Sequence, residues 1–228
     1  MTGLHIRRNA LGIQGINESA PVILTLTNIT YLTLTHVYRG LHVISLAQVN
    51  TKKSALQNIE SICGNLTKLK KLDLSGNEIK CNVVAILQSL QSPLTHLALG
   101  DCGLKDSDLH EMCTIENLGH LEYLNLNSQG YGRSHEVFSA FVLKSAATLK
   151  SLTTEDTHYS STCSSIVRLF NLVRKLPLLI KLSLSCIKLS PDCIRAFKKE
   201  FPTVELLNTY CTKSSRLVRW PTGDMLQI

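Results

Sequence analysis

The sequence predicts an α/β repeat solenoid, because one leucine motif recurs at a nearly constant step. The motif is complete in Leu69-x-x-Leu72-x-Leu74-x-x-Asn77-x-Ile79 and again in Leu94-x-x-Leu97-x-Leu99-x-x-Cys102-x-Leu104. Its second apolar position recurs at nearly even intervals along the chain, at Ile44, Leu72, Leu97, Leu124, Leu152 and Leu182. This is the signature of leucine-rich repeats. We therefore expect a curved horseshoe with parallel strands on its inner face and helices on its outer face.

Each motif predicts a short strand and then a turn. Leu72 and Leu74 alternate with polar residues, as expected when one strand face is buried and the other is not. At Asn77 and Cys102 the side chain should turn inward and satisfy backbone groups of neighbouring strands, a role typical of this repeat class. The expected strands cover about 70–75, 95–100, 122–127, 150–155 and 180–185.

The interval between motifs leaves room for a helix in each repeat. Three sites resemble helix starts: Ser54 as the first residue of a capping box, Asp106 as an N-cap, and Ser190 before Pro191. Apolar residues at helical spacing follow the strands, for example Val83, Val84, Ile86, Leu87 and Leu90; Val137, Phe138, Phe141 and Val142; and Ile166, Val167, Leu169, Phe170 and Val173.

The two ends are less regular. The repeat domain is expected over residues 41–207, with its earliest unit at Leu41-x-x-Ile44-x-Leu46. Residues 1–40 are expected to form an irregular N-terminal cap or a degenerate repeat, because Leu32 precedes Ile44 by less than half of the regular interval. Periodicity is lost after Leu206, so residues 208–228 are expected to form a C-terminal tail.

Composition favours a folded protein over a disordered one. The chain has 228 residues, of which 44% are hydrophobic and 18% charged. No apolar run approaches the roughly 18 to 20 residues of a spanning helix, and no apolar block follows the basic N-terminus, so neither a membrane nor a signal peptide is expected. The net charge is +7, but only 5% of residues are aromatic, so a solvated basic surface is favoured over nucleic-acid binding.

Cysteine usage indicates a reducing compartment. None of the eight cysteines forms a C-x-x-C pair, and most lie among apolar residues, where a free thiol acts as a small hydrophobe. We therefore expect the cytoplasm, with the nucleus as an alternative. Glycosylation triplets begin at Asn17, Asn28 and Asn65 and keep open the alternative of a secreted or cell-surface recognition protein.

No catalytic pattern is present. The sequence lacks a Gly-rich phosphate loop, a G-x-S-x-G elbow and an H-E-x-x-H motif. His96 near Asp101, and His110 near Glu111, are interpreted as surface or turn residues rather than acid–base pairs. Cys102 occupies a repeat position and should be buried. We expect no enzymatic activity, no cofactor and no metal.

The predicted functional surface is the concave face. Residues between the leucines should point to solvent there and bind another protein, the alternative being a plain solvated sheet. Tyr123 is the best single anchor, because aromatic side chains dominate interface hot spots. The expected contact residues are Lys71, Asp73, Ser75, His96, Tyr123, Asn125, Asn127, Glu155 and Lys181.

The segment from Ser89 to Val204 resembles the PRAME (preferentially expressed antigen in melanoma) family and its leucine-rich-repeat relatives, within the ribonuclease-inhibitor-like class. The most specific part is Pro93-Leu94-Thr95-His96-Leu97-Ala98-Leu99 followed by Cys102-Gly103-Leu104 and Asp108-Leu109. Ala146 to Leu152 and Leu179 to Leu189 match later family segments. Two departures are Asn127 to Tyr131, which replaces a closing apolar residue, and Thr154 in place of leucine.

The resemblance implies a non-catalytic interaction module, used as a substrate-recognition or regulatory adaptor related to ubiquitin-ligase receptors. Some family members are substrate receptors of cullin ligases and recruit elongin through a short box outside the repeats. Leu109-x-x-x-Cys113 and Leu189-x-x-x-Cys193 fit the core of that box crudely, but both fall on expected repeat helices. An elongin or cullin partner is therefore expected only if a box lies outside this chain.

Overall fold

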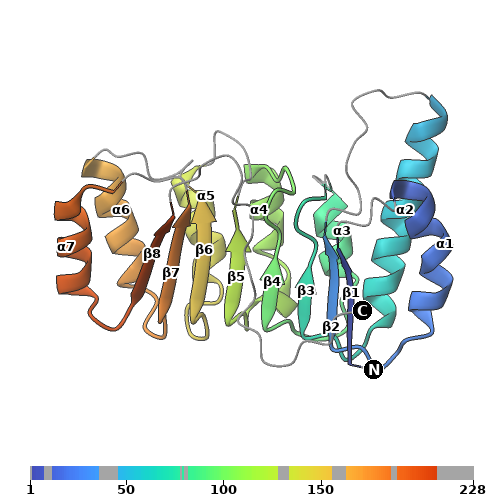
Figure 1. Ribbon diagram of the computed structural model, residues 1–228, viewed down its shortest axis with the longest axis horizontal. Helices are drawn as coiled ribbons and strands as arrows, with labels where there is room; N and C mark the ends of the chain where they lie inside the picture. The colour runs from blue at the N-terminus through green and yellow to red at the C-terminus, as the bar shows by residue number, and fades with distance from the viewer. Residues whose placement is uncertain are drawn as a thin grey trace.

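The computed structural model of the chain describes residues 2–7, 12–35, 46–77, 79, 82–127, 134–155, 163–185 and 189–209. Within them, eight parallel strands form one sheet in chain order, and Figure 1 shows the sheet running the length of the molecule. The strands are β1 Gly3–Arg7, β2 Tyr31–Thr35, β3 Lys71–Asp73, β4 His96–Ala98, β5 Tyr123–Leu126, β6 Ser151–Glu155, β7 Lys181–Ser185 and β8 Glu205–Thr209.

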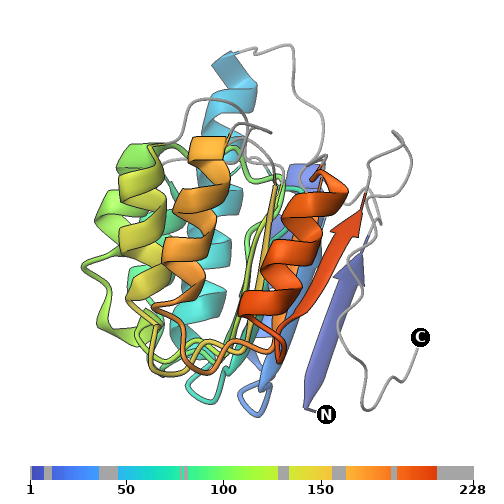
Figure 2. The same ribbon diagram turned by 90° about the vertical axis from the view of Figure 1, so that its left-hand side faces the viewer.

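A helix follows each strand from β1 to β7, and the described helices lie on one side of the sheet (Figure 2). They are α1 Gly12–Leu24, α2 Leu46–Asn65, α3 Val83–Gln88, α4 Asp106–Met112, α5 His135–Leu143, α6 Cys163–Val173 and α7 Pro191–Glu200; the short 3-10 helix η2 Glu116–Leu118 precedes β5. We call the opposite side of the sheet the strand face. No described helix is long and apolar enough to cross a membrane.

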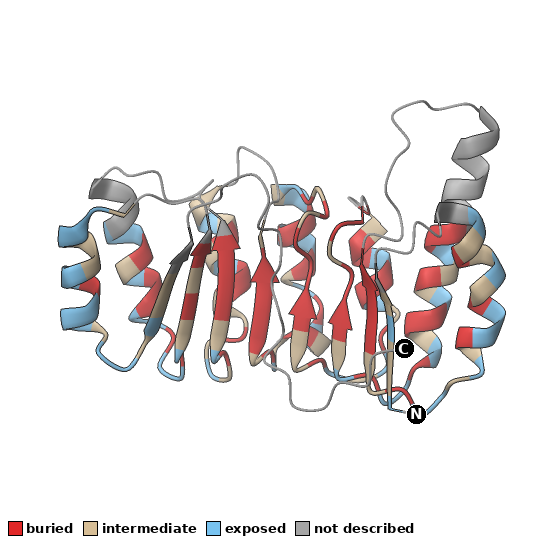
Figure 3. Ribbon diagram, in the orientation of Figure 1, coloured by how far each residue is buried: buried red, intermediate tan, exposed pale blue. Residues whose placement is uncertain are grey.

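The core is a stack of equivalent leucines. One leucine from each of β2 to β7 aligns with its neighbours, and all six are fully buried: Leu32, Leu72, Leu97, Leu124, Leu152 and Leu182. The helices pack their apolar sides onto this stack, so the buried residues gather between sheet and helices (Figure 3). The leucine motif of the sequence thus corresponds to the buried sheet face, as expected, and the leucine-rich-repeat fold class is confirmed.

The repeat expected at Leu41–Leu46 is wrong. Leu46 begins α2, and residues 41–45 lie outside the described residues. The place beside β3 belongs to β2, where Leu32 aligns with Leu72. The interval from Leu32 to Leu72 is longer than the others because α2 is 20 residues long. Counting back from Leu72 by the regular interval therefore reaches Ile44, whereas the leucine that aligns with Leu72 is Leu32.

The sheet also extends further toward both ends than expected. Leu4 of β1 aligns with Leu32 at the regular interval, so β1, α1 and β2 form a strand–helix–strand unit in register with the later repeats. At the other end, Leu206 aligns with Leu182 and β8 continues to Thr209, beyond the expected boundary at 207. The rest of the expected tail lies outside the described residues.

Helix starts were predicted with mixed success. Ser190 caps α7 as expected, since its hydroxyl accepts from the Cys193 N–H at 3.2 Å. Ser54 lies inside α2, which begins at Leu46, so the helix start expected at Ser54 is wrong. Asp106 is the first residue of α4 rather than its N-cap, which is Lys105.

Two further details differ from the expected helix pattern. A carboxylate oxygen of Asp108 accepts from the Lys105 N–H at 2.7 Å, whereas Asp106 accepts from the Ser134 N–H of the next repeat at 2.7 Å. Proximity to a helix start therefore does not identify which of two nearby aspartates bonds to it. Val167 of α6 is 56% exposed, so the expected apolar side of that helix is narrower than its sequence indicates.

Candidate partner-binding surface

The strand face carries rows of side chains in register. The first row joins the starting residues of six strands: Tyr31, Lys71, His96, Tyr123, Ser151 and Lys181. The second row lies two residues further along: Thr33, Asp73, Ala98, Asn125, Thr153 and Ser183. Ser75 and Asn127 follow β3 and β5, and Glu155 ends β6 with its side chain outside the described part. The backbone register therefore brings the predicted contact residues of the first and second rows to one face of the sheet.

Only part of this face is accessible to a partner. Lys71, Ser75, His96, Asn127 and Lys181 are partly exposed. By contrast Asp73 is 6%, Tyr123 7% and Asn125 4% exposed, so the expectation that these three point freely into solvent is wrong. Strands lie about 4.8 Å apart, and side chains of one row therefore cover one another.

Tyr123 is packed within the row rather than protruding from it. Its ring stacks on the ring of His96, with centroids 5.8 Å apart and planes inclined by 15°. Its hydroxyl is hydrogen-bonded to the Thr153 side chain, and burial raises the pKa of Tyr123 to about 12. The side chain thus ties β5 to β4 and β6, and its role as an interface anchor stays a prediction.

Asp73 and Asn125 are also held in internal contacts. Asp73 Oδ1 accepts from the Ser75 N–H at 3.0 Å, and Asn125 Oδ1 accepts from the Asn127 N–H at 3.0 Å. These are equivalent Asx turns in two repeats, and each ends a strand in the same way. The second row therefore shapes the strand ends, a role that the spacing Asp/Asn-x-Ser/Asn could have indicated.

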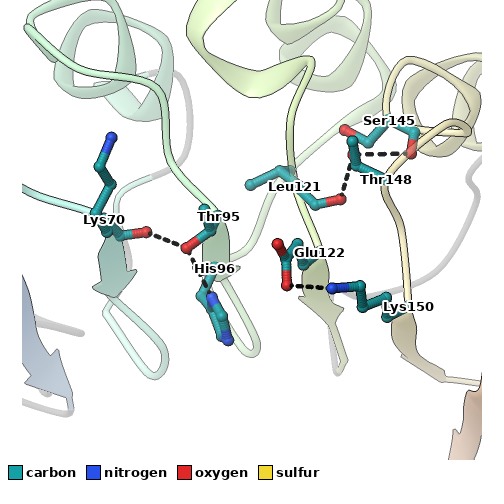
Figure 4. A network of polar contacts seen from close by, with 8 residues as sticks. All are labelled: Lys70, Thr95, His96, Leu121, Glu122, Ser145, Thr148 and Lys150. Carbon is teal, nitrogen blue, oxygen red and sulfur yellow. Dashed lines mark hydrogen bonds and ion pairs between the residues drawn. The ribbon is translucent and has the colours of Figure 1, made fainter.

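The first half of the face is aromatic and cationic. Lys71 Nζ lies 6.0 Å from the centroid of the Tyr31 ring, and His5 meets that ring edge-on at 4.5 Å. His96 Nδ1 lies 2.9 Å from the Thr95 hydroxyl (Figure 4). Burial first, and then the charge of Lys71, lower the pKa of His96 to about 4. His96 is therefore neutral at neutral pH and lies in a positive local potential.

Polar contacts between adjacent repeats join the turns that lead into the strands. The Thr148 hydroxyl donates to the Leu121 carbonyl at 2.9 Å, and Lys150 pairs with Glu122 at 2.9 Å (Figure 4). Buried Ser145 donates to the Leu118 carbonyl at 2.6 Å. Each bond joins one repeat to the one before it, so the surface is preorganised before any partner arrives.

The inward turn positions behave as the motif predicts. Fully buried Asn77 donates through Nδ2 to the carbonyls of Leu34 and Leu74, the latter at 2.7 Å. At the equivalent position one repeat later, Cys102 Sγ lies 3.3 Å from the Leu74 carbonyl. Burial raises the pKa of the Cys102 thiol, so this side chain stays protonated and is unsuited to nucleophilic attack.

The remaining candidates for chemistry do not form a site. His110 is exposed on α4. Among the residues that the structure describes, no three His, Cys, Asp or Glu side chains are grouped as metal ligands would be.

Parallel strands in leucine register, inward Asn and Cys positions and one layer of helices define a leucine-rich-repeat protein. Solved structures agree on the fold. The leucine-rich repeat-containing protein LegL7 from Legionella pneumophila matches with a TM-score of 0.50 and 18% identity, over 81% of this chain and 57% of that one. A protein from Bacteroides fragilis matches with a TM-score of 0.55 and 10% identity, over 92% of this chain and 65% of that one.

The chain belongs to the family described as the PRAME C-terminal domain, whose sequence pattern matches residues 13–196. Two similar proteins are "Leucine-rich repeat-containing protein 14" of Bos taurus and of Homo sapiens. Each is 26% identical over 145 residues, which is 63% of this chain and 29% of the relative. The match thus spans less than a third of the relatives' length. Fold and family together make this chain a protein-interaction module, in a family of generally non-catalytic binding scaffolds.

Proposed function

We propose that the chain is a substrate-recognition or regulatory adaptor related to ubiquitin-ligase receptors, and that it holds its protein partner on the strand face. The observation that supports this proposal is the first row, in which six strands present side chains in register on the side free of described helices. Four of these side chains are partly exposed and polar: Lys71, His96, Ser151 and Lys181.

The dimensions of the face suit an extended segment or a shallow protein surface. Eight strands at about 4.8 Å span roughly 34 Å, the length of about ten residues of extended chain. The row is held by the leucine stack beneath it and by bonds between repeats, so little ordering is required on binding. Partner contacts should therefore fall on the partly exposed residues, while Asp73, Tyr123 and Asn125 support the surface from within.

Recruitment of a ligase is a separate matter. Leu109 of α4 is fully buried, so the segment from Leu109 to Cys113 is repeat core and not an accessible elongin box. Leu189 and Cys193 are partly exposed at the start of α7, where Ser190 caps the helix. We infer that this chain binds a target without bringing elongin to it. Recovery of elongin by the purified chain from cell lysate would contradict this inference.

A reducing compartment, the cytoplasm or alternatively the nucleus, is part of the proposal. Its support is that Cys63 and Cys102 are fully buried free thiols. Of the three glycosylation triplets, Asn17 accepts from Asn58 between α1 and α2 at 2.8 Å, which hinders glycan attachment there. Asn28 and Asn65 are exposed. Glycans on these two residues of protein isolated from cells would favour the secreted alternative.

A steric block tests the binding face. Ser151→Arg with Ser183→Arg places two large side chains on the strand face at partly exposed positions. The matched control carries the same change at exposed helical positions, Ser61→Arg with Ser107→Arg. Proteins captured from cell lysate are compared by quantitative mass spectrometry, after circular dichroism shows both variants to be folded.

We expect proteins that the wild type and the control capture to fall at least tenfold with the blocked variant. Equal recovery by all three would place the binding surface elsewhere and would refute the proposal.

A further inference from the structure

Three lysines that are close in sequence lie just before β3 and at its first residue, and we call them the lysine corner: Lys68, Lys70 and Lys71. Lys68 Nζ donates to Asn28 Oδ1 at 2.7 Å, and Lys70 Nζ lies 3.5 Å from the Pro93 carbonyl. Lys71 Nζ lies over the Tyr31 ring. Within the described part of the chain, none of the three forms an ion pair with a carboxylate.

Two other lysines near the starts of strands form ion pairs with a glutamate of an adjacent repeat. Lys150 pairs with Glu122 at 2.9 Å, and Lys181 pairs with Glu205 at 3.7 Å. The residue equivalent to Glu122 beside Lys70 is Thr30, and the residue equivalent to Glu205 beside Lys71 is His96. Neither of these neighbours carries a negative charge. The positive charge of the sheet edge is therefore concentrated at one end of the strand face.

This charge acts on the surface that a partner would touch. Lys71 and Lys150 both oppose protonation of His96, and Glu122 only partly offsets them. Asp73, the carboxylate two residues after Lys71, is 6% exposed and accepts from the Ser75 N–H. The carboxylate closest in sequence is thus buried, whereas Lys68 and Lys70 are exposed and Lys71 is partly exposed.

We propose that the lysine corner binds an acidic segment of the partner protein, whose carboxylates lie over the three lysines while its chain continues along the first row. This inference rests on the proposed function and names the chemistry of its partner. Charge complementarity selects the occupant, because three cations without carboxylate partners favour a segment rich in Asp or Glu.

A nucleic acid fits the same surface less well. Single strands are held by aromatic rings on which bases stack, beside a basic groove. Here the rings of His96 and Tyr123 stack on each other, and the Tyr31 ring is occupied by Lys71 and His5. An extended acidic peptide needs no free aromatic face, so it is the occupant that the contacts favour.

The test uses a fluorescein-labelled twelve-residue peptide with Glu at alternate positions between Ser and Gly, and a second peptide with Lys in place of Glu. Binding to the whole chain is measured by fluorescence anisotropy at low and at physiological salt. The corner variant is Lys68→Gln, Lys70→Gln and Lys71→Gln. The control variant removes three exposed lysines of the helical side, Lys175→Gln, Lys198→Gln and Lys199→Gln, and changes net charge equally.

We expect the acidic peptide to bind the wild type more tightly than the basic one, and more weakly as salt rises. The corner variant should lose about tenfold in affinity, while the control should stay within about twofold. Equal loss in both variants would show general charge attraction and overturn the inference. So would no preference for the acidic peptide, or tighter binding of a single-stranded oligothymidylate of twelve nucleotides.

The two proposals fail in different ways. If the acidic peptide is not preferred but the strand-face arginines still abolish partner capture, the lysine corner is wrong and the binding face stands. If the corner variant loses the peptide but the strand-face arginines leave partner capture unchanged, the corner stands and the proposed binding face fails.

Discussion

Replacing Asn77 with alanine should lower the free energy of unfolding by roughly 2 to 6 kcal/mol. Asn77 is fully buried, and its Nδ2 donates to carbonyls of two neighbouring repeats, that of Leu34 in β2 and that of Leu74 just after β3. Alanine leaves both carbonyls buried without this donor, and each loss costs about 1 to 3 kcal/mol. The sum of two such losses gives the expected range.

The next repeat supplies a graded comparison. Cys102 occupies the equivalent position and approaches the Leu74 carbonyl with a weaker donor, the thiol, at 3.3 Å. Asn77→Cys should therefore lose less stability than Asn77→Ala. The matched control is Asn65→Ala, because Asn65 is exposed and donates only to the Ser61 carbonyl of its own helix, at 2.8 Å. This change should stay within about 0.5 kcal/mol of the wild type.

Urea unfolding followed by far-ultraviolet circular dichroism measures all three variants. The slope of the unfolding free energy against urea concentration should be equal among the variants. A change in this slope would indicate separate unfolding of one end of the repeat array. A loss below about 1 kcal/mol for Asn77→Ala would refute the reasoning, because that is the least expected from a single lost bond. So would equal losses for the alanine and cysteine variants, because the bonds would then contribute nothing beyond packing.

Three further predictions follow from individual side chains. Leu97→Ala should destabilise by roughly 2 to 5 kcal/mol in the same titration, because a fully buried leucine leaves a cavity; a change under about 0.5 kcal/mol would show that Leu97 is not core. The Cys102 thiol should react with a disulfide reagent only on unfolding, whereas partly exposed Cys193 should react first; fast labelling of Cys102 in native protein would contradict its burial. His96 should titrate near pH 4 by NMR, and Lys71→Gln should raise its pKa. Because the unfolded state binds this proton with a pKa of about 6.5, stability should decline as pH falls from about 6.5 toward 4. The full shift corresponds to about 3 kcal/mol, which solvent screening of the partly exposed ring reduces to roughly 1 kcal/mol, and His96→Gln should remove this loss.

The regular repeats were predicted from sequence because their signal is local. Leucine at every second residue of a short strand, followed by Asn77 or Cys102, identifies the buried face of that strand without knowledge of the neighbouring repeats. The register of β3 to β7 follows from that motif alone. The first unit was misplaced for the opposite reason, since the long helix α2 separates Leu32 from Leu72 and its length is not set by the strand motif.

The sequence by itself determined the repeat class, the strand register of the central units and the set of side chains that share the strand face. Only the tertiary structure decided which of those side chains reach solvent. Tyr123 and His96 occupy the same row in the sequence pattern, yet Tyr123 is covered by a ring from β4 and bonded to Thr153 from β6. Strand alternation gives the direction of a side chain, but its exposure depends on neighbours one whole repeat away along the chain, which meet only when the strands align.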